Sequence, residues 1–224
     1  MLEGEQTMTT PAAMRMPLES GDHLSREEFH RRSCVWPEIK KAELINGVVY
    51  VSSPVSAAHA EPHASLIGWL FSYKARHPGL ALLDNGTVLL APDSEVQPDA
   101  TLLRVTSPWS ARITAKQYVE GAPELVAEIA ASSAAIDLHG KLRAYERADV
   151  LEYLVWAVYE QRFRWFRLRE GIYVELAADA DGIITSEVFP GLQLAVQALL
   201  DGDDRAVLAA LDQPGAGRTD AGTE

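Results

Sequence analysis

The sequence predicts a mixed α/β domain in which helices flank a central sheet. Segments with helical spacing and segments with strand-like spacing of apolar residues follow one another along the chain, and two Asn-Gly pairs stand between apolar runs, as in hairpins. The 224 residues are 47% hydrophobic and 23% charged, which is ordinary for a globular protein. A domain of this size buries enough apolar surface to fold without a disulfide or a zinc ion.

The N-terminal third is expected to hold two helices and a hairpin. Ser25, with Glu28 three residues later, has the capping-box pattern of a short helix. Apolar runs on both sides of Asn46-Gly47 predict two paired strands. Residues 62–77 carry apolar side chains at helical spacing and precede a Pro-Gly pair, which predicts a longer helix that ends there.

Proline and asparagine set the expected boundaries of the next segments. Pro62 is expected to disrupt any helix that begins well before it. A second hairpin is expected to turn at Asn85-Gly86. Residues 94–105 have the composition of a strand that Pro98 interrupts.

The C-terminal half continues the alternation of strands and helices. Trp165-Phe166 breaks the alternation of an arginine-rich strand, which allows a bulge there. Its arginines either contact phosphate or cover apolar surface with their stems, and the second interpretation is favoured. The elements are expected as a strand at 123–130, a helix at about 134–148, strands at 150–159 and 161–170, short strands within 171–194 and a helix at about 195–211.

One domain is expected, at residues 21–212. Residues 1–20 lack periodicity and are expected to form a flexible arm, and the Gly-rich polar residues 213–224 a disordered tail. Neither a signal peptide nor an apolar run long enough to span a bilayer is evident, so we expect a cytoplasmic protein without a membrane partner. Cys34 is the only cysteine, which excludes an intramolecular disulfide and a Cys-cluster metal site.

The net charge of −12 disfavours a protein that coats nucleic acid nonspecifically. The charge is compatible with a nuclease, in which clustered carboxylates hold metal ions while a few basic residues meet phosphate.

Two carboxylates suggest a metal site. Asp99 follows Pro98 at a strand interruption, where a side chain is re-aimed, and Glu128 stands within an apolar strand where an ionised group needs a partner. If these strands are neighbours, both carboxylates converge. Two carboxylates with waters and a phosphate oxygen suit Mg²⁺, with Mn²⁺ as an alternative.

The helix that follows Glu128 offers a cation. Ser133 is a candidate N-cap, and Asp137, Lys141 and Tyr145 fall at helical spacing on one face. Other interpretations of these residues stay open. Asp99 suits a turn, the Asp137–Lys141 pair suits a solvated surface, and alternation with Val126 allows Glu128 to face solvent.

Several short segments, taken in order, resemble the Uma2 family within the PD-(D/E)XK nuclease superfamily. They are "AELINGVVYVSSPVSAAH", "VQPDA", "PELVAEIAASS", "DLHGKLRAY" and "ADVLEYLVW". The resemblance covers roughly residues 25–211 and implies a restriction-endonuclease-like fold, in which helices flank a mixed central sheet. The implied activity is a Mg²⁺-dependent DNA endonuclease, and cutting both strands would favour a homodimer.

The resemblance also implies roles for individual residues. Asp99 and Glu128 match the two metal-binding acidic positions of the superfamily. Ala130 stands where the superfamily has lysine, and Lys141 on the following helix is the implied replacement. Further matching positions that border the implied site are Glu43, His59 and Tyr145, the last supporting Lys141.

Two other functions remain open. A fold of this kind does not prove catalysis, and Ala130 is compatible with an inactive relative that serves as a binding module. A hydrolase of small phosphodiesters would use the same metal site. A zinc protease is disfavoured because Glu61 is misplaced between His59 and His63, and His63 is expected to be structural.

Overall fold

The computed structural model describes residues 16–35, 41–106, 111–131 and 136–212. The predicted tail 213–224 and the first fifteen residues of the predicted arm lie outside the described residues. The helices are α1 (Arg26–Ser33), α2 (Ala57–Arg76), the π-helix η2 (Ile136–Lys141), α3 (Leu142–Arg147), α4 (Val196–Leu200) and α5 (Asp204–Ala210).

The strands are short and are distributed along the whole described chain. They are β1 (Ala42–Ile45), β2 (Val48–Val51), β3 (Leu80–Asp84), β4 (Val88–Ala91), β5 (Ser94–Val96), β6 (Ala100–Arg104), β7 (Arg112–Ile113), β8 (Val119–Glu120), β9 (Leu125–Ala130), β10 (Glu152–Ala157), β11 (Arg162–Arg169), β12 (Ile172–Glu175), β13 (Ile183–Thr185) and β14 (Gln193–Ala195).

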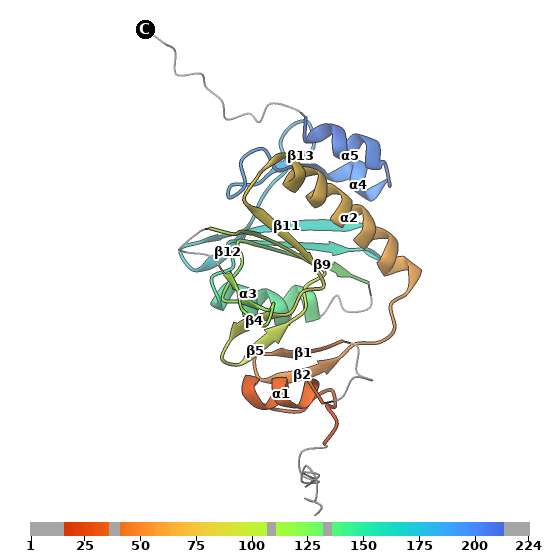
Figure 1. Cartoon of the computed structure of the whole chain (residues 1–224). Helices are drawn as coiled ribbons and strands as arrows, with labels where there is room; N and C mark the ends of the chain where they lie inside the picture. Colours follow the sequence, from red (N-terminus) through yellow and green to blue (C-terminus); the bar gives the residue numbers. More distant parts are fainter. Residues whose placement is uncertain (1–15, 36–40, 107–110, 132–135, 213–224) are drawn as a thin grey trace, which may run out of the picture.

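The strands form two six-stranded mixed sheets and a small β13–β14 ribbon. Sheet A has the order β2-β1-β5-β4-β8-β7, and sheet B has the order β12-β11-β10-β9-β6-β3. Helix α3 lies between the two sheets, α1 lies on the far side of sheet A, and α2, α4 and α5 lie beyond sheet B (Figure 1). The predicted mixed α/β class is confirmed, and the central sheet B is accompanied by a second sheet.

The hairpin at Asn46-Gly47 is present. β1 and β2 pair antiparallel, with Ile45 opposite Val48. Asn46 has φ 52° and Gly47 has φ 81°, which are the two positive values that a two-residue type I′ turn requires.

The second predicted hairpin is wrong. β3 pairs with β6 in sheet B, whereas β4 pairs with β5 and β8 in sheet A. Asn85 has φ 50°, but Gly86 does not adopt the left-handed backbone that a type I′ turn needs at its second residue. The chain therefore passes from one sheet to the other at this point.

The interruption at Pro98 is also a crossing between sheets. β5 belongs to sheet A and β6 to sheet B, so Asp99 lies where the chain returns from the first sheet to the second. The backbone N–H of Asn85 donates to the carbonyl oxygen of Asp99 at 3.4 Å, which joins the two crossings.

Helix α2 begins earlier than expected. It starts at Ala57, so the expectation that Pro62 would disrupt a helix beginning well before it is wrong. Proline so near the start of a helix removes only one backbone hydrogen bond.

No helix in the described part of the chain is apolar over a length that would cross a membrane.

The last predicted helix is two helices. α4 ends at Leu200 and α5 begins at Asp204, with Gly202 between them at φ 74°. The side chain of Asp203 caps α5 by accepting a hydrogen bond from the backbone N–H of Ala206 at 3.0 Å. A left-handed glycine followed by a capping aspartate ends one helix and starts the next.

Strand β9 is buried on both faces. Leu125 and Ile129 belong to an apolar cluster that includes α2, and Val126 and Ala130 belong to the cluster that includes α3. Glu128 alternates onto the α3 face with Val126 and Ala130, and it is 2% exposed. The interpretation that Glu128 faces solvent is therefore wrong.

The arginines of β11 are paired on the surface. The register between β10 and β11 runs without a shift, so the Trp165-Phe166 pair makes no bulge. Trp165 and Phe166 are both buried, because this part of sheet B is covered on both faces. All four arginines lie within salt-bridge distance of Glu175 or Glu187, which supports the interpretation that they are not a phosphate site.

Candidate active site

Asp99 and Glu128 occupy neighbouring positions in sheet B. β6 pairs with β9 antiparallel and Ala100 lies opposite Ala127, so the next step of the register places Asp99 opposite Glu128. The backbone N–H of Ile129 donates to Asp99 Oδ2 at 2.8 Å. Both carboxylates are 2% exposed. The structure thus brings the two acidic residues together.

Lys141 connects the two sheets through carboxylates. Its Nζ lies 2.9 Å from Glu43 Oε2 on β1 and 2.9 Å from Glu128 Oε1 on β9. Glu43 Oε1 also accepts a hydrogen bond from the backbone N–H of Gln97 at 2.7 Å. Because Glu43 and Lys141 are both buried, the ammonium group offsets two charges that water does not solvate.

The π-helix η2 delivers this lysine. Lys141 is its last residue, and α3 continues from Leu142. The predicted Ser133 cap and the side chain of Asp137 lie outside what the structure describes. Ala130 stands where the superfamily resemblance implies lysine, and it is 1% exposed on the face of β9 that packs against α3. Lys141 approaches Glu128 from this same face of β9.

Tyr145 supports Glu128 from α3. Its hydroxyl donates to Glu128 Oε1 at 2.8 Å, and the side chain is fully buried. Burial, together with the charges of Glu128 and Glu43, raises the pKa of Tyr145 well above its ordinary value. Tyr145 therefore acts as a hydrogen-bond donor and not as a base.

Replacing Tyr145 with phenylalanine is expected to lower the free energy of unfolding by about 1.5–3 kcal/mol, because a hydrogen bond to a charged group is lost. Lys141 still neutralises Glu128, so any metal-dependent activity is expected to persist at a reduced rate. Urea denaturation checks the stability, with Tyr159→Phe as the control because Tyr159 is 69% exposed. Equal stability of both variants would contradict the role of this hydroxyl.

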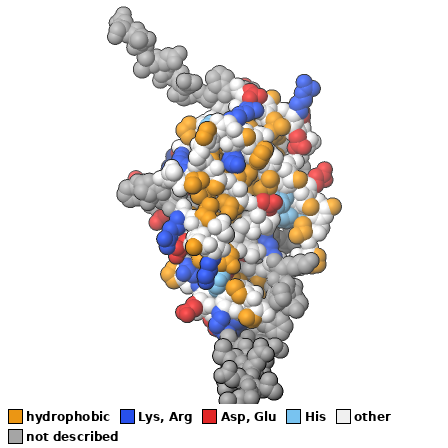
Figure 2. All heavy atoms as spheres, in the orientation of Figure 1, with side chains coloured by type: hydrophobic (Ala, Val, Ile, Leu, Met, Phe, Trp, Pro, Cys, Tyr) orange, Lys and Arg blue, Asp and Glu red, His pale blue; other side chains and the backbone are white. Residues whose placement is uncertain are grey.

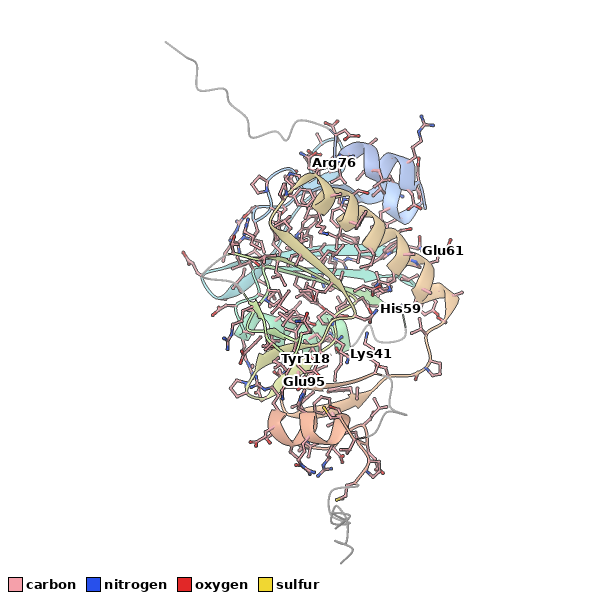
Figure 3. All side chains as sticks on the ribbon, in the orientation of Figure 1. Lys41, His59, Glu61, Arg76, Glu95 and Tyr118 are labelled. Carbon is pink, nitrogen blue, oxygen red and sulfur yellow. The ribbon has the colours of Figure 1, made fainter. Side chains whose placement is uncertain are left out.

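Polar groups surround Asp99 as well. His59 Nε2 lies 3.2 Å from Asp99 Oδ2, and Lys41 Nζ lies 3.2 Å from Asp99 Oδ1. His63 Nε2 lies 2.9 Å from the backbone oxygen of Asp99, and His63 lines the same cavity. Figure 3 shows Lys41, just before β1, and His59 of α2 approaching one another, with Glu61 exposed away from them.

These contacts favour the ionised forms of both Asp99 and Lys41. Burial alone would raise the pKa of Asp99, but the hydrogen bond with His59, the charge of Lys41 and the N–H of Ile129 hold it well below its ordinary value. Burial would lower the pKa of Lys41, but the nearby carboxylates, Asp99 foremost, raise it above its ordinary value. The pair is ionised at neutral pH.

Asp99 is expected to stabilise the metal-free protein at neutral pH and not in acid. Its folded pKa lies below the ordinary unfolded value of about 3.9, so its contribution is present above that value and is lost as the pH falls through the folded pKa. The difference in unfolding free energy between wild type and Asp99→Asn should be largest near neutral pH and shrink below about pH 4. Urea denaturation in EDTA across this range checks it, and a constant difference would be the contrary result.

The carboxylates open onto a cavity of about 480 Å³. The exposed segment 52–56 forms one side of it, and Asp99, Glu128, Lys41 and Lys141 line it from within. Within the described ranges, no group of three or more His, Cys, Asp or Glu side chains is arranged to hold a metal ion. Mg²⁺ does not require such a group, because one or two carboxylates complemented by water and substrate oxygens suffice. The carboxylate oxygens of Asp99 and Glu128 therefore fit it chemically.

Sequence reasoning missed two residues of this site. Lys41 Nζ contacts Asn85 Oδ1 at 3.1 Å in addition to Asp99. Lys41 stands two residues before Glu43, and that spacing places both side chains on one face of a strand, which was the available signal. Asn85 was expected to be a hairpin residue. No sequence pattern indicates that it lies where the chain crosses between the sheets and accepts a hydrogen bond from Lys41.

His59 carries an unsatisfied atom beside the cavity. Its Nε2 contacts Asp99, while its Nδ1 is buried and has no hydrogen-bond partner among the described residues. The resemblance placed His59 at the border of the site, and its ring does line the cavity.

Comparisons with known proteins agree with this fold. The model of the Uma2 family, described as "Putative restriction endonuclease", matches residues 26–197. A solved structure with the same arrangement is the "putative nuclease belonging to DUF820" from Anabaena variabilis ATCC 29413. It is 12% identical with a TM-score of 0.57, and the match covers 76% of this chain and 90% of that one. A search of curated proteins gave no match. Since the family model spans most of its length, the chain belongs to the Uma2 family.

Proposed function

We propose that this protein is a metal-dependent phosphodiesterase and that its substrate is DNA. The observation that supports the proposal best is the pair of buried carboxylates, Asp99 and Glu128, which stand opposite each other in the strand register on the wall of one cavity. Each has a lysine ammonium within 3.2 Å. Buried carboxylates that share a cavity with lysines are arranged for chemistry on an anion, because such a cluster is costly as mere structure.

Asp99 and Glu128 would hold Mg²⁺ or Mn²⁺, with Glu43 as a further carboxylate on the opposite sheet. The bound ion would supply an activated water and would stabilise the charge that develops on the phosphate. His59 and the N–H of Ile129 both contact Asp99 Oδ2, so they fix the orientation of that carboxylate.

Lys141 would help to orient the attacking water and offset the negative charge. Its ammonium already holds Glu43 and Glu128 in one place. Tyr145 fixes Glu128 from α3, the helix that continues directly from η2. Lys141 and Tyr145 together hold the Glu128 side chain in one rotamer. A carboxylate that takes part in a reaction must stay aligned in this way.

The proposal that the substrate is DNA rests on the family description and not on a basic surface. Lys and Arg side chains are spread over the face shown in Figure 2 and do not form one continuous patch, while hydrophobic side chains gather near its middle. The net charge is −12. Binding of a polyanion would therefore depend on the metal ion and on the few cations at the cavity.

Calorimetric titration with Mg²⁺ and Mn²⁺, followed by cleavage assays, tests the proposal. Single-stranded, double-stranded and branched DNA, RNA and bis(p-nitrophenyl) phosphate are the substrates to compare. We expect metal binding and metal-dependent cleavage of DNA. Cleavage of the small phosphodiester alone would show a small-molecule hydrolase. Absence of metal binding even with DNA present would contradict the proposal and favour a binding module.

The oligomeric state is a separate part of the proposal. An enzyme that cuts both strands of a duplex benefits from two sites related by symmetry, so we propose a homodimer on the substrate. Sedimentation with and without duplex DNA measures it.

A further inference from the structure

The two lysines of the site differ in how firmly they are held. The side chain of Lys141 is 4% exposed and is fixed between Glu43 and Glu128. The side chain of Lys41 is 23% exposed and contacts Asp99 and Asn85. Lys41 is therefore the cation that can change partner without unpacking the space between the sheets.

The backbone aims Lys41 into the cavity. It immediately precedes β1, and it shares a face with Glu43, two residues further along. Asn85, at φ 50°, holds its side-chain oxygen toward the ammonium group, and asparagine is among the few residues that tolerate this left-handed backbone. Lys41 reaches Asp99 from sheet A across the crossing between the sheets, while its stem stays on the cavity wall.

The charges at the cavity make Lys41 and a metal ion competitors. Asp99, Glu43 and Glu128 bring three negative charges, and Lys41 and Lys141 bring two positive ones. A divalent cation that binds Asp99 would repel the ammonium group 3.2 Å from the same carboxylate. An ammonium on a flexible four-carbon stem can then move to another anion within reach. The anion that enters with the metal is the phosphate of the substrate.

We propose that Lys41 is a substrate-contacting residue with two partners: it neutralises Asp99 in the free protein and binds a phosphate oxygen once a divalent cation occupies Asp99. The inference rests on the proposed metal-dependent function and extends it by one residue. Any lysine paired with Asp99 opposes metal binding, but only a lysine with this role also favours substrate binding, so the substrate contact separates it from an ordinary structural salt bridge.

The test compares Lys41→Met with Lys41→Arg and with Lys116→Met. Lys116 is exposed and is not among the residues that line the cavity, so it controls for the loss of one positive charge. Calorimetry with Mn²⁺ in the absence of DNA measures metal affinity. Steady-state cleavage of supercoiled plasmid DNA and of bis(p-nitrophenyl) phosphate measures the substrate contact, and circular dichroism confirms that each variant is folded.

Lys41→Met is expected to bind Mn²⁺ about two- to fivefold more tightly, the range of a partly exposed ion pair that no longer competes. The same variant should lose about tenfold or more in kcat/KM, because a charge-assisted contact to phosphate is gone. Lys41→Arg should restore both values toward wild type, and Lys116→Met should leave both unchanged.

Two results would overturn the inference alone. In the first, the wild type binds Mn²⁺ and cleaves DNA, and Lys41→Met has the same kcat/KM. In the second, Lys41→Met binds Mn²⁺ more weakly than the wild type does. A wild type that neither binds metal nor cleaves either substrate would overturn the proposed function and this inference with it.

Discussion

Asp99→Asn is expected to abolish metal-dependent cleavage while the protein stays folded, with a loss of rate of at least about 10²–10³-fold. Asparagine has the shape of aspartate and keeps an acceptor for the N–H of Ile129. It lacks the negative charge that a divalent cation requires and that now faces Lys41. The effect should appear in metal affinity as well as in rate.

The matched control for this variant is Asp93→Asn. Asp93 has a side chain that is 43% exposed and pairs with Arg147 on the surface. Calorimetry with Mg²⁺, plasmid cleavage and thermal unfolding of both variants would be compared. Cleavage by Asp99→Asn at the wild-type rate would remove Asp99 from the site, whatever the control shows.

Lys141→Met is expected to cause the largest loss of stability, about 3–5 kcal/mol. Methionine fills a similar volume, but Glu43 and Glu128 then lose the cation that lies 2.9 Å from each. Two like charges remain buried between the sheets, where repulsion is weakly screened. Cleavage should also be lost.

A rescue experiment separates charge from packing in this variant. Adding Glu43→Gln to Lys141→Met should recover part of the stability, because one buried charge is removed. Mn²⁺ should raise the unfolding temperature of Lys141→Met more than that of wild type, since a bound cation replaces the missing charge. Urea denaturation measures the first effect and thermal unfolding the second. A loss below about 1 kcal/mol, as for a surface pair, would contradict the role of this lysine.

Much of the fold follows from local patterns. Helix α1 with its Ser25 cap, the type I′ turn at Asn46-Gly47 and the strand around Glu128 depend on residues close together in the chain. Local patterns also show why the second hairpin failed. An Asn-Gly pair between apolar runs does not determine whether the following strand pairs with the preceding one or joins another sheet. The pairing depends on strands that are distant in the sequence.

The candidate site is less visible in the sequence than the fold. Asp99 and Glu128 attract notice as charges in strand-like segments, and the family resemblance links them to Lys141, Glu43, His59 and Tyr145. The local signal for Lys41 is weak, namely its spacing of two residues from Glu43, because a lysine just before a strand is ordinary. Its significance comes from the crossing at Pro98, which brings Asp99 to the same cavity from the other sheet.

The site lies between two sheets, so it is complete only after both sheets have folded. Sheet A supplies Glu43 and Lys41, sheet B supplies Glu128, and η2 supplies Lys141, so contacts far apart in sequence must all form first. Such long-range contacts form late in folding. A nascent chain that has built only one sheet lacks part of the candidate site, so the proposed cleavage would be absent until the second sheet has formed.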